Sequence, residues 1–303
     1  MDKMLIKRQL NKKFVPRHVP LDTLMRCNDS LQSMVDPMPV GRSVVLNVAP
    51  EEDISKAIWI GDKQRELGVH PHFLDREIEI KLEILGSQEP IEQIMIKLMS
   101  GLKALGYLFP HPEIYVRENY CVYYSKKDGR KGKIIARGLG SQGFLYKQKS
   151  ENRSYSEPGV IIKDEEKSPV FKTFAEAKDH LASKAGIKEG ARLRVESIIK
   201  IRKLKQTILA IGDDSITRFF SLTVDESSIP LQEPSNRVHR NLRQIEVEYK
   251  GSDKQEKDSL EVILAQILKI RKQILLQADV PTRKTLQSKR QWALEKYCSP
   301  INC

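Results

Sequence analysis

The sequence predicts an α+β fold in which strands close into a barrel with a charged interior and α-helices cover its outside. Strand-length segments alternate between charged and apolar residues, most clearly where Glu77, Glu79 and Lys81 stand between aliphatic residues. Side chains on a strand point alternately to its two faces, so such a segment has one charged and one apolar face. Two amphipathic helical segments would cover the apolar faces: 90–105 and 258–277.

Composition is that of a soluble globular protein. The chain has 303 residues, of which 40% are hydrophobic and 30% charged, which allows one large domain or two small ones. A net charge of +12 favours a polyanionic partner, although a basic solvated surface explains it equally well. The four cysteines form no paired metal-binding motif, and neither a signal peptide nor an apolar window of bilayer length is present. We therefore expect a reduced, cytoplasmic protein that contacts no membrane.

Three parts follow one another along the chain. Residues 1–75 are broken by repeated prolines and form an N-terminal extension of unknown role. Residues 76–250 carry the alternating segments and form the main domain. Residues 251–303 are expected to be helices that pack on this domain.

Within the main domain, each element follows from its pattern. Residues 76–85 alternate as a strand, and 90–105 place apolar residues on one helical face before Gly106 ends the helix. Strand patterns follow at 114–124, 132–137, 144–149, 191–202, 206–211, 216–226 and 243–250, with a helix predicted at 171–184. The C-terminal helix 258–277 begins at Asp258 or Ser259 as its cap, and another follows Pro281 and ends near Tyr297.

The charged faces allow two interpretations. Taken alone, each fits a strand face exposed to water, which is the usual antiparallel arrangement. However, acid pairs at the two ends of the region, Glu77/Glu79 and Glu246/Glu248, bracket basic pairs such as Lys200/Arg202. This order favours a barrel with its charges inward. Charges inside a protein are costly unless paired, and a bound polyphosphate with metal ions would compensate them.

These residues, in this order, resemble a known family. Glu77-x-Glu79-x-Lys81, the later Lys200-x-Arg202, a strand ending at Asp225 and a closing Glu246-x-Glu248 are similar to the triphosphate tunnel metalloenzymes, or CYTH superfamily. The resemblance covers residues 76–250. It implies an antiparallel eight-stranded tunnel that binds a triphosphate together with Mg²⁺ or Mn²⁺.

The resemblance also implies roles for individual residues. The implied metal ligands are Glu77, Glu79, Asp225, Glu246 and Glu248. The implied substrate ligands are Lys81, Arg137, Lys147, Lys200 and Arg202. The residues expected to carry catalysis are Glu77, Glu79, Lys81, Lys200 and Arg202. Ser125 follows Tyr123-Tyr124 where many members have Asp, so any role of that Asp is missing here.

The expected function is metal-dependent hydrolysis of a triphosphate: tripolyphosphate, a nucleoside triphosphate or thiamine triphosphate. Three alternatives stay open. A tunnel-type (class IV) adenylate cyclase would use the same charged residues to make cyclic AMP from ATP. An RNA 5′-triphosphatase would suit the positive net charge. A non-catalytic module would bind a triphosphate without turnover. The sequence is also compatible with a homodimer.

Overall fold

The structure is a computed structural model that describes residues 45–46, 76–111, 114–125, 131–137, 143–149, 153–154, 159–184, 194–229, 241–256, 258–277 and 280–297. Almost all of the predicted N-terminal extension 1–75 lies outside these residues. The strands are β1 (Val45–Leu46), β2 (Arg76–Ile84), β3 (Ile114–Ser125), β4 (Lys131–Arg137), β5 (Gly143–Lys149), β6 (Arg153–Ser154), β7 (Val160–Phe171), β8 (Arg194–Ile211), β9 (Thr217–Ser228), β10 (Leu242–Ser252) and β11 (Thr282–Lys284). The helices are α3 (Ile91–Ala104), α4 (Phe174–Lys184), α5 (Leu260–Gln277) and α6 (Lys289–Tyr297).

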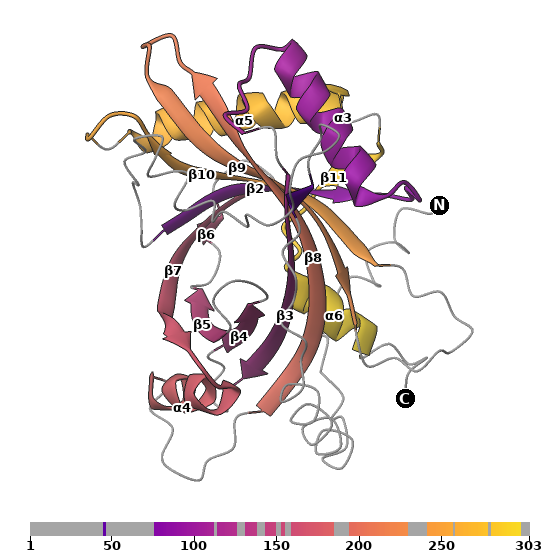
Figure 1. Ribbon diagram of the computed structural model, residues 1–303, viewed down its shortest axis with the longest axis vertical. Helices are drawn as coiled ribbons and strands as arrows, with labels where there is room; N and C mark the ends of the chain where they lie inside the picture. Colours follow the sequence, from indigo (N-terminus) through magenta and orange to yellow (C-terminus); the bar gives the residue numbers. More distant parts are fainter. Residues whose placement is uncertain are drawn as a thin grey trace, which may run out of the picture.

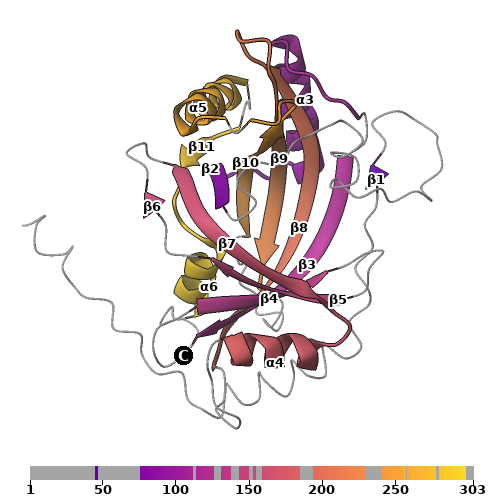
Figure 2. The same ribbon diagram turned by 90° about the vertical axis from the view of Figure 1, so that its left-hand side faces the viewer.

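The strands form one curved antiparallel sheet (Figures 1 and 2). Its order is β11-β2-β10-β9-β8-β3-β4-β5-β7-β6, with β1 beside β3 and a further ladder between β2 and β7. Along β2, residues 79–83 pair with β10, whereas 76–80 pair with β7. The α+β class and the antiparallel sheet with helices around it are confirmed. The closed barrel of eight strands is not shown: among the described residues the sheet has eleven strands, of which β1, β6 and β11 are only two or three residues long.

Most predicted elements are found close to their expected bounds. The segments 191–202 and 206–211 were expected as two strands, but they join into the single 18-residue strand β8. Strand β7 was not predicted. The predicted helix 171–184 begins only at Phe174 because Phe171 still belongs to β7.

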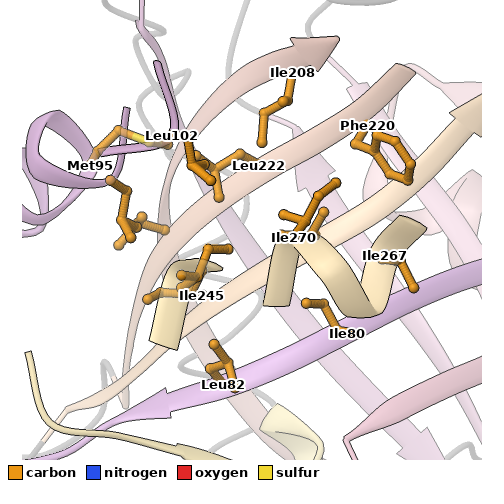
Figure 3. Packing of buried hydrophobic residues seen from close by; sticks show 14 of the residues in the cluster. Ile80, Leu82, Met95, Leu102, Ile208, Phe220, Leu222, Ile245, Ile267 and Ile270 are labelled. Atoms are coloured by element: carbon orange, nitrogen blue, oxygen red, sulfur yellow. The ribbon is translucent and has the colours of Figure 1, made fainter. Parts of the chain in front are cut away.

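One face of the sheet carries the main hydrophobic core; we call it the apolar face. Figure 3 shows Ile80 of β2, Leu222 of β9 and Ile245 of β10 packed with Met95 of α3 and Ile267 of α5. Each of these strand residues is flanked along the chain by residues of the opposite face, as the alternation predicts. Helices α3 and α5 therefore pack on β2, β10, β9 and the second half of β8.

The helix ends have defined caps. At the end of α3, Gly106 has a φ of 88°, the Gly106 N–H donates to the carbonyl of Lys103, and the Tyr107 N–H donates to that of Leu102. This is a Schellman motif, which needs a residue that tolerates positive φ. Helix α5 is capped by Ser259, whose hydroxyl accepts from the Val262 N–H at 3.3 Å, which confirms one of the two predicted caps.

The opposite face of the sheet, the polar face, carries the charged residues of β2, β10 and β9. Helix α6 packs on part of this face: Trp292 and Ala293 share a buried cluster with Ile199 and Ile201 of β8. Helix α4, in contrast, lies beneath β4 and β5 (Figure 2) and packs through Ala177 and Leu181 on the apolar side. Thus one C-terminal helix lies on the same side of the sheet as the charges.

Among the described residues, no helix has the length and apolar character needed to cross a membrane. The division of the chain at residues 75 and 250 stays a prediction.

Candidate functional site

Strand register brings charged residues from four strands together on the polar face. Lys81 of β2 lies directly opposite Glu246 of β10, and Asp225 of β9 lies directly opposite Lys203 of β8. Glu246 and Asp225 are diagonal neighbours, because Glu246 pairs with Thr223, two residues before Asp225. Cross-strand and diagonal neighbours on one face are within reach of long side chains.

These side chains form a continuous set of ion pairs. Lys81 Nζ lies 2.9 Å from Glu79 Oε1 and 3.1 Å from Glu246 Oε1. Lys203 Nζ lies 3.4 Å from Glu246 Oε2 and 3.7 Å from Asp225 Oδ2. Glu246 is therefore shared by lysines from strands on either side of it.

Helix α6 contributes a third lysine. Lys289 Nζ lies 2.8 Å from Asp225 Oδ2 and 2.6 Å from Glu246 Oε1, which are the shortest contacts that either carboxylate makes in the set. We call Glu79, Lys81, Lys203, Asp225, Glu246 and Lys289 the central cluster. Its three acids and three bases balance in formal charge.

Burial makes this balance necessary. Every member of the central cluster except Lys203 is buried, and Asp225 has no exposed surface. Burial alone would lower the pKa of Lys81, but the carboxylates of Glu246 and Glu79 raise it well above its usual value. Burial alone would raise the pKa of Glu246, yet Lys203, Lys289 and Lys81 lower it well below its usual value. Lys81 therefore stays charged, and Glu246 stays ionised.

Asp225 behaves differently from Glu246. Burial raises its pKa, and Lys289 opposes this only in part. Its Oδ1 atom has no hydrogen-bond partner among the described residues. A buried carboxylate oxygen that accepts no hydrogen bond is unusual and energetically costly. Such an oxygen is well suited to bind a metal ion.

The acids of the central cluster are of the type that binds a divalent metal, and each of them is paired with a lysine. Carboxylate oxygens are the ligands that Mg²⁺ and Mn²⁺ prefer, and Mg²⁺ is commonly bound by one or two carboxylates together with phosphate oxygens. Asp225 and Glu246 form such a pair because both contact the same Lys289 nitrogen. In the part of the chain that the structure describes, no group of three or more His, Cys, Asp or Glu residues could hold a metal.

The other predicted acids lie at the margin of the cluster. Glu248 lies opposite Glu79 in the ladder and forms an ion pair with Lys250. Glu77 lies opposite Lys163 of β7, whose Nζ reaches Glu79 Oε1 at 3.9 Å. Glu79, Asp225 and Glu246 therefore form ion pairs with the lysines of the central cluster. Glu77 acts on Lys81 through its charge, and Glu248 pairs with Lys250.

The predicted basic residues are divided between the two faces. Lys81 is central, and Lys147 of β5 forms an ion pair of 2.8 Å with Glu165 of β7. Lys200 and Arg202 lie on the opposite face of β8 from Lys203, together with the core residue Leu204. Arg202 Nη2 contacts Glu92 of α3 at 2.5 Å, and its side chain is 44% exposed. Arg137 lies opposite Asn119 of β3 and Gly143 of β5 in the two ladders of β4.

Sequence reasoning missed Lys163, Lys203 and Lys289. The signal for Lys203 was present, because Lys203, Lys205 and Thr207 alternate with Leu204, Gln206 and Ile208. In 198–202 the odd-numbered residues are apolar, whereas from Lys203 to Thr207 they are polar. Ile199 and Ile201 therefore lie on the same face as Lys203, where they share a buried cluster with Trp292 of α6. For Lys289 no local signal exists, since its position depends on where α6 packs.

No family model and no curated protein matches the chain. Solved structures of low identity align with it over most of its length. HpAC1 from Hippeastrum, an adenylyl cyclase by name with a dominant triphosphatase activity, is 13% identical, with a TM-score of 0.39 over 70% of this chain and 92% of that chain. The RNA triphosphatase domain of the trifunctional mimivirus mRNA capping enzyme is 11% identical, with a TM-score of 0.39 over 72% of this chain and 100% of its own.

A third similar structure is the Mediator head module of Schizosaccharomyces pombe. It is 12% identical, with a TM-score of 0.38 over 69% of this chain and 98% of that chain. All three TM-scores lie below 0.5.

Proposed function

We propose that the protein binds a triphosphate on the polar face of the sheet and hydrolyses it with the help of Mg²⁺ or Mn²⁺. The observation that carries this proposal is the central cluster, in which three buried carboxylates and three lysines from β2, β8, β9, β10 and α6 meet. Such a cluster offers acids for a metal and bases for phosphate oxygens on neighbouring strands.

The division of labour follows from the chemistry of phosphoryl transfer. That reaction needs positioning of the phosphate chain and neutralisation of its charge more than covalent chemistry by the protein. Asp225 and Glu246 would hold the metal, which supplies charge neutralisation on the phosphate oxygens and lowers the pKa of a bound water. Lys81 and Lys203, on either side of Glu246, would each hold a phosphate oxygen as a point charge. Glu79 would keep Lys81 oriented through their 2.9 Å contact.

A closed tunnel of eight strands is part of the proposal. The β2–β7 ladder supports it, because the path of paired strands from β2 through β10, β9, β8, β3, β4, β5 and β7 returns to β2. A phosphate chain enclosed in this way would meet Lys163 of β7 and Lys147 of β5 after the central cluster. The substrate would be a small triphosphate or the 5′ end of an RNA, in the cytoplasm.

A second function has one observation in its favour. The carboxylates of the central cluster are paired with lysines, and no metal-holding group of three occurs among the described residues. This arrangement favours a module that binds a triphosphate without turnover. Glu77 and Glu248, predicted as metal ligands, would then serve only to set the charge of the polar face.

Product analysis distinguishes these functions. The full chain is incubated with tripolyphosphate, ATP, thiamine triphosphate and an RNA that carries a 5′-triphosphate, each with Mg²⁺ and with Mn²⁺. Orthophosphate release supports the hydrolase, and cyclic AMP with pyrophosphate indicates a cyclase. Tight binding without any product supports the module. If no triphosphate binds, the proposal is wrong in all its forms.

Replacing Glu246 tests the role of the central cluster directly. We expect Glu246→Gln to lower the rate of phosphate release by at least about 100-fold, the loss typical when a preorganised electrostatic group at a reacting centre is removed. The matched control is Glu261→Gln, which changes an exposed glutamate on α5 and should leave the rate unchanged. Circular dichroism verifies that both variants fold. Equal rates in the two variants would place the chemistry elsewhere.

A further inference from the structure

Helix α6 is held on the polar face by contacts at its first turn and along its side. Ser288 and Gln291 form a capping box: the Gln291 N–H donates to the Ser288 hydroxyl at 3.1 Å, and the Ser288 N–H donates to Gln291 Oε1 at 3.0 Å. This box makes Lys289 the first residue of the helix. Trp292 and Ala293 then pack on Ile199 and Ile201 of β8.

This anchoring places one lysine nitrogen between the two best metal ligands. Lys289 Nζ contacts Asp225 Oδ2 at 2.8 Å and Glu246 Oε1 at 2.6 Å. The other lysines near these atoms are farther from Asp225: Lys203 lies 3.7 Å from Asp225 Oδ2, and the close contacts of Lys81 are with Glu79 and Glu246. A cation shared by these two carboxylates would need the volume that the Lys289 ammonium fills, because Mg²⁺ sits about 2.0–2.1 Å from its oxygen ligands.

We propose that Lys289 is a tethered counter-ion that competes with the divalent metal for Asp225 and Glu246, so that metal loading displaces Lys289 and the start of α6. The proposal rests on the proposed function, since it assumes that these carboxylates are the metal site. In the metal-free protein the lysine neutralises two buried carboxylates that would otherwise repel each other. In the loaded protein the same charge becomes available beside the bound phosphates.

Two predictions follow that do not depend on turnover. First, removal of the Lys289 charge should strengthen metal binding, because the metal then has no competitor. Second, metal binding should alter the surroundings of α6. Trp292 reports on them, because it lies three residues after Lys289 and packs on β8.

The first experiment is a Mn²⁺ titration of the full chain by calorimetry, with and without tripolyphosphate. We expect Lys289→Gln to bind Mn²⁺ at least about tenfold more tightly than the unaltered chain, a difference of about 1.4 kcal/mol. The matched control, Lys272→Gln, removes the same charge from an exposed position on α5 and should bind Mn²⁺ as the unaltered chain does.

The second experiment keeps Lys289 and therefore does not depend on the folding of a variant at that position. The chain contains two tryptophans, Trp59 and Trp292. In Trp59→Phe, Trp292 is the single tryptophan. We expect its emission to change on saturation with Mn²⁺ and tripolyphosphate. Adding Lys289→Gln should remove most of this change, since the link between the metal site and α6 is then absent.

The outcomes separate the inference from the function on which it rests. If Mn²⁺ binds equally to the Lys289→Gln and Lys272→Gln variants, but Asp225→Asn abolishes binding, the metal site stands and the competition is disproved. An unchanged Trp292 emission in the metal-loaded protein disproves it as well. If Lys289→Gln instead weakens tripolyphosphate binding with unchanged Mn²⁺ affinity, Lys289 is a phosphate ligand and the inference is wrong. If no variant binds Mn²⁺, the metal-dependent function and the inference fall together.

Discussion

The side of a strand on which a lysine lies decides its role in this protein. Lys200 and Lys203 are three positions apart on β8, so they lie on opposite faces of the sheet. Lys200 lies near the ring of Tyr120, with its nitrogen 5.9 Å from the ring centroid. Lys203 contacts Glu246 and Asp225, and although burial alone would lower its pKa, these two carboxylates raise it. Of these two lysines, Lys203 is therefore the one that contributes its charge to the central cluster.

The two lysines form a matched pair for an experiment at this scale. We expect Lys203→Met to weaken tripolyphosphate binding at least about tenfold, because removal of one charge-assisted contact costs about 1.5–3 kcal/mol. Lys200→Met removes the same charge from the same strand and should change binding less than about twofold. Isothermal titration of both variants provides the measurement. A larger loss for Lys200→Met would restore the residue that the sequence pattern favoured.

At the scale of elements, Arg218 joins the β8–β9 hairpin to the start of α5. Its guanidinium bonds Asp214 Oδ2 at 2.6 Å and Asp258 Oδ1 at 3.0 Å. Tyr249 of β10 donates a further hydrogen bond to Asp258. Arg218 is almost fully buried, so its charge requires these carboxylates. The contacts of Asp258 with Arg218 and Tyr249 join the start of α5 to β9 and β10.

This junction should make stability sensitive to acid. Hydrogen bonds from Arg218 lower the pKa of Asp214 from 3.8 to about 2. Burial would raise the pKa of Asp258, but hydrogen bonds from Tyr249 and Arg218 lower it. A carboxyl group with a depressed pKa in the folded state stabilises the fold above its unfolded pKa. That contribution is lost as the pH falls below about 4 towards 2.

Urea denaturation between pH 5 and pH 2.5 measures this effect. We expect the free energy of unfolding to fall with pH in the unaltered chain and to fall less steeply in Asp214→Asn. The control is Asp213→Asn, which removes the neighbouring exposed carboxylate and should keep the original slope. Identical slopes for all three proteins would show that the Asp214 ion pair contributes nothing to folding.

At the scale of the whole molecule, the sheet separates the hydrophobic core from the charged central cluster. Its apolar face holds the core between β2, β8, β9, β10, α3 and α5. Its polar face holds the central cluster and α6. Core residues and polar-face residues alternate along each strand, since neighbouring residues such as Leu222 and Thr223 belong to opposite faces. This interleaving explains why the alternating pattern is so informative in the sequence.

The same organisation determines what could be predicted. Strands β2 and β10 were found from the sequence because one face of each is uniformly apolar and belongs to the hydrophobic core that α3 and α5 complete. Strand β8 misled the prediction because α6 covers its polar face at Ile199 and Ile201, whereas Arg202 on the other face pairs with Glu92. Strand β7 was missed because charges occupy both of its faces: Lys163 contacts Glu79, and Glu166 contacts Lys184 of α4. In both strands, tertiary partners decide which side chains are buried, and the local pattern does not report those partners.

Substitution on the apolar face should therefore change stability without changing the site. We expect Leu222→Ala to lower the free energy of unfolding by about 2–5 kcal/mol, because Leu222 has no exposed surface and the cavity left behind cannot fully collapse. The control, Ile211→Ala at the exposed end of β8, where the residue is 62% exposed, should cost less than about 1 kcal/mol. Under conditions where both variants are folded, tripolyphosphate binding should equal that of the unaltered chain. Weakened binding by folded Leu222→Ala, with Ile211→Ala unaffected, would mean that core packing sets the geometry of the central cluster and that the two faces are not independent.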